Sequence, residues 1–212
     1  MLISFKHKFI FLKTFKTAST TTDIYFEQYC ADNLEEQRDR LETISEKGII
    51  GARNFKKQFR EEDLKYINHL PAKKVKKNIG DDIFNSYYKF CNVRNPFDLV
   101  VSNYFYYRKN KDLTFNNFIL DSSNLEQIKK RDSKIYKINN SIIIDDFIRY
   151  EKLQEDIDRI SNHLNLPISN RILGHYLTSK RRYTEDYMSL YNETTESIVR
   201  ESFKEYIEYF GY

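Results

Sequence analysis

The stretch FIFLKTFKTASTTT, which runs from Phe9 to Thr22, decides how this chain folds. Its first four residues are aromatic or aliphatic, which is typical of a short buried strand. Two lysines and a cluster of hydroxyl residues follow, and an amphipathic helical pattern begins near Asp23. The stretch therefore predicts a strand, a short polar loop and a helix in direct succession.

The loop of this unit has the composition of an anion-binding site. Lys16 supplies a positive charge, and Thr17 and the hydroxyl residues after it supply neutral donors. A helix N-terminus adds backbone N–H groups that point at an anion. Serine and threonine before a helix are also ordinary N-caps, and loop lysines are often simply solvated, so the loop alone leaves both interpretations open.

The loop departs from the nucleotide-binding template GxxxxGK[ST]. Lys16 and Thr17 match its ending, but Phe15 stands where the template has glycine, and no glycine precedes it. An ordinary ATP- or GTP-binding loop is therefore disfavoured.

The composition describes one globular domain. With 212 residues, of which 40% are hydrophobic and 31% charged, the chain can bury a core of its own. Its net charge of +4 is too mild to imply nucleic-acid binding and suits an anionic ligand equally well. Cys30 and Cys91 have no disulfide or metal-ligand spacing, and we expect them to be buried free thiols.

The first apolar run of the chain is short, and Lys13 interrupts it. It therefore fits neither a membrane span nor a signal peptide. We expect a cytoplasmic protein.

A second strand, basic residue and helix begin at Phe90. Phe90–Val93 reads as a strand, and Arg94 follows it directly. Asn95 is a good N-cap and Pro96 a good first residue for the next helix. Ligands of open α/β sheets bind at such carboxyl ends of strands, although Arg94 could instead pair with a carboxylate.

The remaining pattern alternates helices with strands. We expect a surface helix over Asn33–Glu46, a loop over Lys47–Phe55, a helix from Pro71 to Gly80, a third strand over Ser141–Ile144, a helix over Lys152–Leu164 and a last helix ending at Phe210. This order predicts an α/β fold of three layers, α/β/α, around a central, mainly parallel sheet.

Three segments together resemble the sulfotransferases of the carbohydrate type. They are KTASTTT (Lys16–Thr22), VRNPFDLVVSNYFYY (Val93–Tyr107) and IDDFIRYEKLQEDI (Ile144–Ile157). Their order and rough spacing match the family, and the closing FKEYIEYFGY resembles its usual C-terminus. The resemblance covers nearly the whole chain and implies a single sulfotransferase domain over residues 1–212 with a P-loop-NTPase-like fold.

The resemblance implies transfer of a sulfuryl group from 3′-phosphoadenosine 5′-phosphosulfate (PAPS) to a hydroxyl or amine, with a carbohydrate as one candidate acceptor and no metal. Arg94 and Ser102 would bind the 3′-phosphate, and the basic run Lys180, Arg181 and Arg182 falls where the family often closes a loop over the nucleotide. The 5′-phosphosulfate would lie in the loop made by Lys16, Thr17, Ala18, Ser19, Thr20 and Thr21, where Ser19 replaces the usual glycine.

Lys16 and His69 would take part directly in the transfer, which is an in-line displacement at sulfur. Lys16 can neutralise the departing oxygen, as cations do in phosphoryl transfer. His69 lies about where some family members place a catalytic histidine that takes the acceptor's proton. A surface or capping histidine is the competing interpretation.

Two other functions compete with this one. In a small-molecule or nucleoside kinase, Asp145 after the apolar run Ile142–Ile144 would hold Mg²⁺. A nucleic-acid-binding module would use the basic segments Lys56–Lys77 and Lys180–Arg182, but acidic runs are interleaved and no binding motif is visible. We therefore expect a small-molecule or glycan partner, and neither a nucleic acid nor a membrane. The segments Lys47–Lys77 and Leu113–Tyr136 would line the acceptor cleft.

Overall fold

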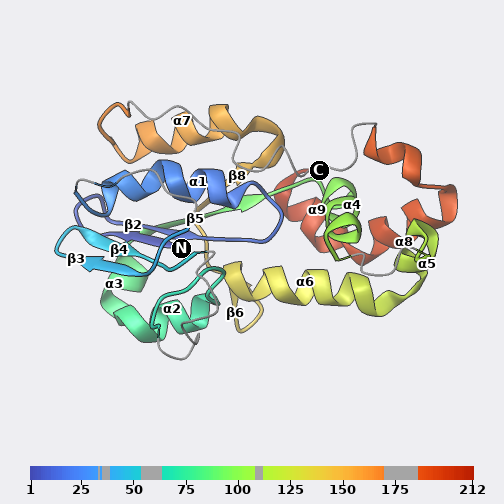
Figure 1. Cartoon of the computed structure of the whole chain (residues 1–212), viewed down its shortest axis with the longest axis horizontal. Coiled ribbons are helices and arrows are strands. Elements are labelled where there is room, and N and C mark those ends of the chain that lie inside the picture. The colour runs from blue at the N-terminus through green and yellow to red at the C-terminus, as the bar shows by residue number, and fades with distance from the viewer. Residues whose placement is uncertain (33, 35–38, 54–63, 108–111, 170–185) are drawn as a thin grey trace.

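The computed structural model describes residues 1–32, 34, 39–53, 64–107, 112–169 and 186–212, and its central element is a six-stranded sheet (Figure 1). The strands, in spatial order, are β3 (Thr43–Ser45), β4 (Gly48–Ile50), β1 (Leu2–Ser4), β2 (Phe9–Leu12), β5 (Tyr88–Val93) and β8 (Asp146–Arg149). Strands β2, β5 and β8 are parallel, whereas β1 and β3 run in the opposite direction to their neighbours. The carboxyl ends of the three parallel strands meet at one edge.

Helices cover both faces of the sheet (Figure 1). On one face lie α1 (Ser19–Phe26), continued by the 3₁₀ turn η1 (Glu27–Tyr29), and α7 (Leu153–His163), which follows the 3₁₀ turn η3 (Tyr150–Lys152). On the other lie α2 (Ala72–Ile79), α3 (Asp81–Ser86) and the carboxyl-terminal part of α6 (Ser122–Tyr136). The alternation of side chains along β2 divides them between the two cores, with Phe9 and Phe11 in one and Ile10 and Leu12 in the other. This arrangement agrees with the predicted α/β class.

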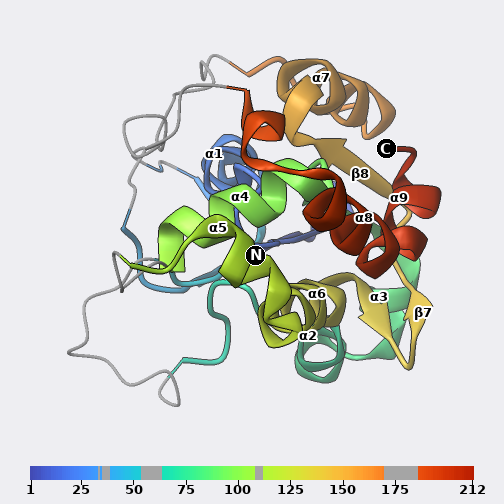
Figure 2. The ribbon, with the colours of Figure 1, turned by 90° about the vertical axis from the view of Figure 1, so that its right-hand side faces the viewer.

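A third core lies beyond the edge where the parallel strands end (Figures 1 and 2). It is built by α4 (Pro96–Tyr107), α5 (Phe115–Leu120), the amino-terminal part of α6, the 3₁₀ turn η5 (Tyr187–Leu190), α8 (Glu193–Ser202) and α9 (Lys204–Phe210). A small hairpin of β6 (Lys137–Ile138) and β7 (Ser141–Ile142) follows α6.

Several predicted elements are confirmed. Strand β2 has the predicted bounds, and β5 contains the predicted Phe90–Val93. Helix α2 lies between Pro71 and Gly80, as expected. Asn95 caps α4, because its Oδ1 accepts the N–H of Phe97 at 3.0 Å. Both cysteines are free and buried.

Other predictions were wrong. Thr43–Ser45 and Gly48–Ile50 form β3 and β4, not part of a helix and a loop, because three-residue strands are too short to show a period. The third parallel strand is β8, whereas Ser141–Ile142 belongs to the hairpin. Helix α1 begins at Ser19 and not near Asp23. The last helix is divided at Phe203 into α8 and α9.

A cluster of charged side chains is buried beneath the loop that follows β2. Lys13 Nζ lies 3.1 Å from Asp23 Oδ2, and Arg53 Nη1 lies 3.3 Å from the same oxygen and 2.6 Å from Glu27 Oε2. Lys13, Asp23, Glu27 and Arg53 are each at most 1% exposed. Burial alone would raise the pKa of Asp23, but Lys13, the N-terminal amine of Met1 and Arg53 hold it well below its usual range. The cluster ties β2 and α1 to the chain that follows β4.

Asp23→Asn should therefore destabilise the protein strongly. The substitution keeps the shape of the side chain but leaves Lys13 and Arg53 buried with one negative charge fewer. We expect a loss of about 3–5 kcal/mol in the free energy of unfolding, measured by urea denaturation. Asp82→Asn, at an exposed position of α3, is the control and should change the stability by less than about 0.5 kcal/mol. A similar small effect at position 23 would contradict this account.

Candidate functional site

The loop between β2 and α1 holds its shape through its own hydroxyl groups. Ser19 Oγ donates to the carbonyl of Thr14 at 2.6 Å, and the hydroxyls of Thr14 and Thr17 lie 2.8 Å apart. Thr14 Oγ1 also donates to the carbonyl of Asn92 on the neighbouring strand at 2.7 Å. Lys16 and Ala18 adopt left-handed backbone conformations, with φ of 59° and 57°. Such conformations cost energy in residues with a side chain, so these bonds must maintain them.

The loop leads directly into the N-terminus of α1. Ala18 is the N-cap, and its carbonyl accepts the N–H groups of Thr21 and Thr22. The hydroxyls of Thr17 and Ser19, which we expected to face a ligand, bond within the loop. The first N–H groups of a helix have no partner inside the helix, so the backbone of this turn is the better candidate for holding an anion.

Arg94 lies beside this loop at the end of β5. Its Nη1 donates to the carbonyl of Lys16 at 2.8 Å, and its Nε and Nη2 donate to Asp98 Oδ2 at 2.8 and 2.7 Å. The guanidinium carbon lies 4.0 Å from the centroid of the Tyr150 ring. Tyr206 on α9 brackets the backbone of Arg94, accepting its N–H and donating to its carbonyl. Arg94 is thus both paired with a carboxylate and placed against the basic loop.

One face of α4 runs along the loop. Asp98, Ser102 and Tyr106 are spaced four residues apart and so lie on the same face. Asp98 contacts Arg94, and the Tyr106 ring centroid lies 4.0 Å from Lys16 Nζ. Ser102, half-buried, lies between these two contacts.

His69 approaches the loop from the segment before α2. Its Nδ1 lies 3.0 Å from the carbonyl of Lys13 and must donate to it, which leaves Nε2 as the unprotonated nitrogen of the neutral ring. The imidazole stacks on the Phe15 ring, with centroids 3.7 Å apart and planes 14° from parallel. Burial, and then the positive charge of Lys13, lower the pKa of His69 to about 3. The ring is therefore neutral at physiological pH in the free protein.

Helix α6 contacts the loop from the other side. Arg131 Cζ lies 4.2 Å from the centroid of the Phe15 ring, and because His69 occupies one face, Arg131 must lie on the opposite face. Asp132 Oδ1 accepts the N–H of Phe15 at 3.1 Å. Burial raises the pKa of Asp132 to about 7.

Most of the residues predicted to form the site are brought together at one edge of the sheet. Lys16 contacts Arg94 through its carbonyl, Ser102 lies on the adjacent face of α4, and His69 stacks on the residue before Lys16. Thr17, Ala18, Ser19, Thr20 and Thr21 form the end of the loop and the first turn of α1. The basic run Lys180–Arg182 lies outside the described residues.

Asp145, on which the kinase hypothesis depended, lies at the opposite edge. Its N–H donates to the carbonyl of Lys89 and its Oδ2 accepts the N–H of Lys89, at the start of β5. Lys16 lies beyond the carboxyl end of β2, which is parallel to β5 and ends where Leu12 pairs with Cys91. Asp145 therefore cannot hold a metal ion for a ligand at the basic loop.

The sequence did not single out Phe15, Tyr106, Arg131 or Asp132, although Arg131 and Asp132 lie in the segment Leu113–Tyr136 that was expected to line the acceptor cleft. Tyr106 could have been found, because it lies one helical turn after Ser102. The individual contacts of Arg131 and Asp132 could not, because the hydrogen bond between Asp132 and Phe15 joins positions 117 residues apart.

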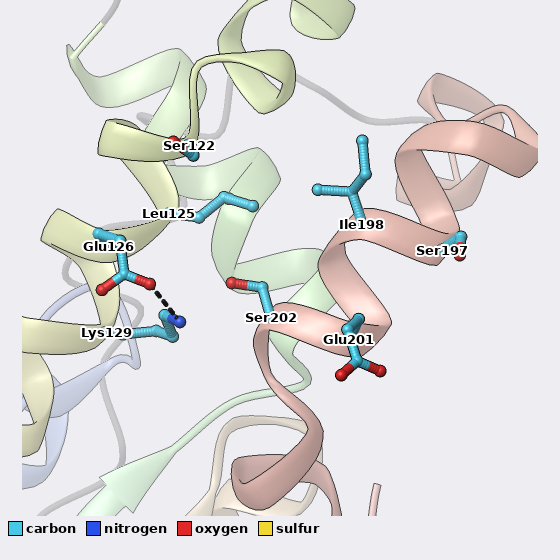
Figure 3. Close-up of a pocket in the computed structure, with 8 residues that line it drawn as sticks. All are labelled: Ser122, Leu125, Glu126, Lys129, Ser197, Ile198, Glu201 and Ser202. Atoms are coloured by element: carbon cyan, nitrogen blue, oxygen red, sulfur yellow. Dashed lines mark ion pairs between the residues drawn. The ribbon is translucent and has the colours of Figure 1, made fainter.

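A separate groove lies between α6 and α8 (Figure 3). Its volume is about 520 Å³, and Leu125 and Ile198 face it from the two helices. None of the residues that line it is a predicted catalytic or donor-binding residue, although its α6 side lies within the segment Leu113–Tyr136 that was expected to line the acceptor cleft. Its other lining residues are Ser122, Glu126, Lys129, Ser197, Glu201 and Ser202.

The fold and the site define a mixed α/β protein with a basic loop, an arginine and a neutral histidine near the carboxyl edge of its parallel strands. The model of the sulfotransferase family matches residues 1–210, and the chain belongs to this family. An uncharacterized protein of Archaeoglobus fulgidus is 36% identical over 107 residues, which cover 46% of this chain and 84% of that protein. No solved structure matches the chain. Among the described residues, no helix has the length and apolar character needed to span a membrane.

Asp132→Asn should stabilise the protein at alkaline pH. The pKa of Asp132 is about 7 in the folded protein against about 3.9 for an unperturbed aspartate, so the folded state keeps a proton that the unfolded state has lost. The contribution of Asp132 to the free energy of unfolding therefore falls as the pH rises from about 4 to 7. We expect the variant to exceed the wild type by at least about 1 kcal/mol at pH 8, since one pKa unit corresponds to about 1.4 kcal/mol.

Urea denaturation at pH 4.5 and pH 8 checks this expectation. The variant should match the wild type more closely at pH 4.5, because asparagine keeps the oxygen that accepts the N–H of Phe15. Equal stability differences at the two pH values would show that Asp132 does not titrate in this range.

Proposed function

We propose that this chain transfers a sulfuryl group from PAPS to the hydroxyl or amine of a small-molecule or glycan acceptor. Membership of the sulfotransferase family supports transfer of this kind. The observation that carries the proposal is the convergence of two side chains, those of Arg94 and His69, on the loop that carries Lys16. Arg94 donates to the carbonyl of Lys16, and His69 donates to the carbonyl of Lys13 while stacking on Phe15.

The two ends of the donor would meet different parts of the site. We assign the 5′-phosphosulfate to Lys16 and to the backbone N–H groups of the loop and of the first turn of α1. Arg94 and Ser102 would hold the 3′-phosphate, and Lys180–Arg182 would close over the nucleotide. Bonds to the described residues use three of the five N–H groups of Arg94, which leaves two for a phosphate.

The reaction follows from these positions. The acceptor oxygen attacks sulfur as the bond from sulfur to the bridging phosphate oxygen breaks, and Lys16 neutralises the charge that develops on the departing oxygen. The acceptor's proton passes to Nε2 of His69. The pKa of His69 is low in the free protein, but the negative charges of a bound donor raise the pKa of a nearby imidazole and make it a better base.

The remaining features of this assignment are also proposals. We propose that the acceptor cleft is lined by the segments Lys47–Lys77 and Leu113–Tyr136. The contacts of His69 and Arg131, one from each segment, with the two faces of the Phe15 ring support this proposal. A carbohydrate acceptor, a P-loop-like classification, independence from metal ions and a cytoplasmic location stay predictions.

Lys16→Ala and His69→Gln should separate transfer from binding. Calorimetry with 3′-phosphoadenosine 5′-phosphate (PAP) measures nucleotide binding. Turnover is measured as transfer of a labelled sulfuryl group from PAPS to each of a panel of hydroxyl and amine acceptors. We expect Lys16→Ala to lower kcat about 100- to 1,000-fold and to weaken PAP binding. His69→Gln should lower kcat about 100-fold or more while PAP binding stays within about twofold.

Two results would overturn the proposal. One is the absence of PAP binding by the wild-type chain. The other is strict Mg²⁺ dependence with ATP turnover, which would favour a kinase. Addition of EDTA should leave sulfuryl transfer unchanged.

Tyr106→Leu should tighten PAP binding. The Tyr106 ring holds Lys16 in a cation–π contact, which competes with an anion for the lysine and is worth about 0.5–1 kcal/mol at an exposed site. Its loss should lower the Kd for PAP about two- to fivefold by calorimetry. Tyr106→Phe keeps the ring and should bind as the wild type does. Weaker binding by Tyr106→Leu would instead place the ring against the nucleotide.

A further inference from the structure

The side chain and the backbone of Phe15 are both fixed. The His69 imidazole stacks on one face of the ring at 3.7 Å, and the Arg131 guanidinium lies over the other at 4.2 Å. The Phe15 N–H donates to the buried carboxyl group of Asp132 at 3.1 Å. Arg131 is itself held, because its Nη2 donates to Asn103 Oδ1 at 2.9 Å. Phe15 is therefore a fixed surface and not a loosely packed loop residue.

His69 needs such a surface. Its hydrogen bond to the carbonyl of Lys13 fixes the tautomer and one direction of the ring, but rotation about that bond would still swing Nε2 through a wide arc. The flat face of Phe15 removes this freedom, because the two planes are only 14° from parallel. His69 also has a left-handed backbone conformation, with φ of 55°, which tertiary contacts must maintain.

In the sequence, Phe15 also lies between Lys16 and the residue whose carbonyl holds His69. It directly precedes Lys16, whose carbonyl accepts from Arg94, and it follows Lys13 by two residues, whose carbonyl accepts from His69. One short loop thus carries the lysine and both contacts of the imidazole.

We propose that Phe15 is a positioning residue that sets the plane of the His69 imidazole and couples it to Lys16. This inference rests on the proposed role of His69 as the base. Leucine at position 15 would keep most of the apolar volume but would offer no flat face, so the ring could turn and water could approach it. Phenylalanine at this position thus serves orientation more than burial.

The titratable and charged groups around the imidazole lie on two sides of it. Lys13, Asp23 and the N-terminal amine of Met1 lie on the side of its hydrogen bond, and Arg131 and Asp132 lie beyond the Phe15 ring. The amine of Met1, with a pKa of about 6, and Asp132, with a pKa of about 7, titrate close to the range of the test. A change in the pH profile of the variant is therefore assigned to the imidazole only where the pH titration of the His69 NMR signal shows the same pKa.

Kinetics of three variants test the proposal. Phe15→Leu removes the stacking surface, and Phe15→Tyr retains it. Phe147→Leu is the matched control, because Phe147 is also half-buried, meets the Phe210 ring edge-on and has Arg149 over its face at 4.8 Å, on a strand outside the site. Each variant is assayed for kcat, for KM of donor and acceptor, for PAP binding by calorimetry and for thermal unfolding.

We expect Phe15→Leu to lower kcat about 10- to 100-fold, the range that misplacement of a reacting group can cost, with PAP binding within about twofold. Its kcat/KM should fall below about pH 6.5, where a hydrated imidazole gains a proton. Phe15→Tyr should restore at least half of the wild-type kcat. Phe147→Leu should lose thermal stability but keep kcat and the pH profile.

A measurement that needs no turnover tests the same contact. Protons of an imidazole stacked on a phenyl face are shifted upfield in the NMR spectrum, and His69→Gln identifies the His69 signal among the four histidines. Phe15→Leu should move this signal toward that of an exposed histidine, whereas Phe147→Leu should not. Failure of the proposed function would appear as absent PAP binding and transfer, and the NMR result would still decide whether Phe15 orients His69.

The proposal is overturned if the His69 signal is the same in Phe15→Leu as in the wild type. It is also overturned if Phe15→Leu lowers kcat no more than Phe147→Leu does at equal loss of thermal stability. Either outcome would reduce Phe15 to a packing residue.

Discussion

The hydrogen bond from the Arg94 guanidinium to the carbonyl of Lys16 is the contact on which the site depends. It joins the two strand-to-helix connections that leave β2 and β5, and Asp98 fixes the same guanidinium from α4. A charged donor makes a stronger hydrogen bond than a neutral one, and Arg94 itself is only 6% exposed. Together with the contact between Lys16 and the Tyr106 ring, it fixes the basic loop against α4, and the Tyr150 ring that follows β8 lies over the same guanidinium.

Beneath this contact the protein buries charges where a small domain would normally bury hydrocarbon. Lys13, directly after β2, and Asp23 on α1 form an ion pair that is buried between these two elements. Buried ion pairs seldom add stability over apolar residues, but they fix geometry because a misplaced partner is costly. Lys13 also presents its carbonyl to His69, so the same residue links the buried cluster to the candidate base.

The sequence revealed the parts of the fold that depend on local chemistry. The apolar run of β2, the cap formed by Asn95 and the amphipathic face of α7 all follow from neighbouring residues, and these predictions are confirmed. The antiparallel half of the sheet was missed, because three-residue strands gain their stability from partners elsewhere in the chain.

The arrangement of the candidate site followed from the sequence only in part, and for the same reason. Lys16 and Arg94 stand out in sequence because each follows a strand and precedes a helix. His69 is held by the Phe15 ring, which α6 holds in turn through Asp132. Contacts between residues so far apart in the chain cannot be predicted from a local sequence pattern. The direction of the loop hydroxyls could not be predicted either, because it depends on which carbonyl each hydroxyl donates to.

The double use of Lys13 has a wider consequence. Its ammonium group belongs to a buried ionic assembly that extends to Glu27 and Arg53, while its peptide oxygen steadies the imidazole. Under the proposed role of His69 as the base, a substitution that shifts this remote assembly would act on turnover as well as on folding. Positions that touch no ligand would then influence the rate of transfer through the position of one peptide oxygen.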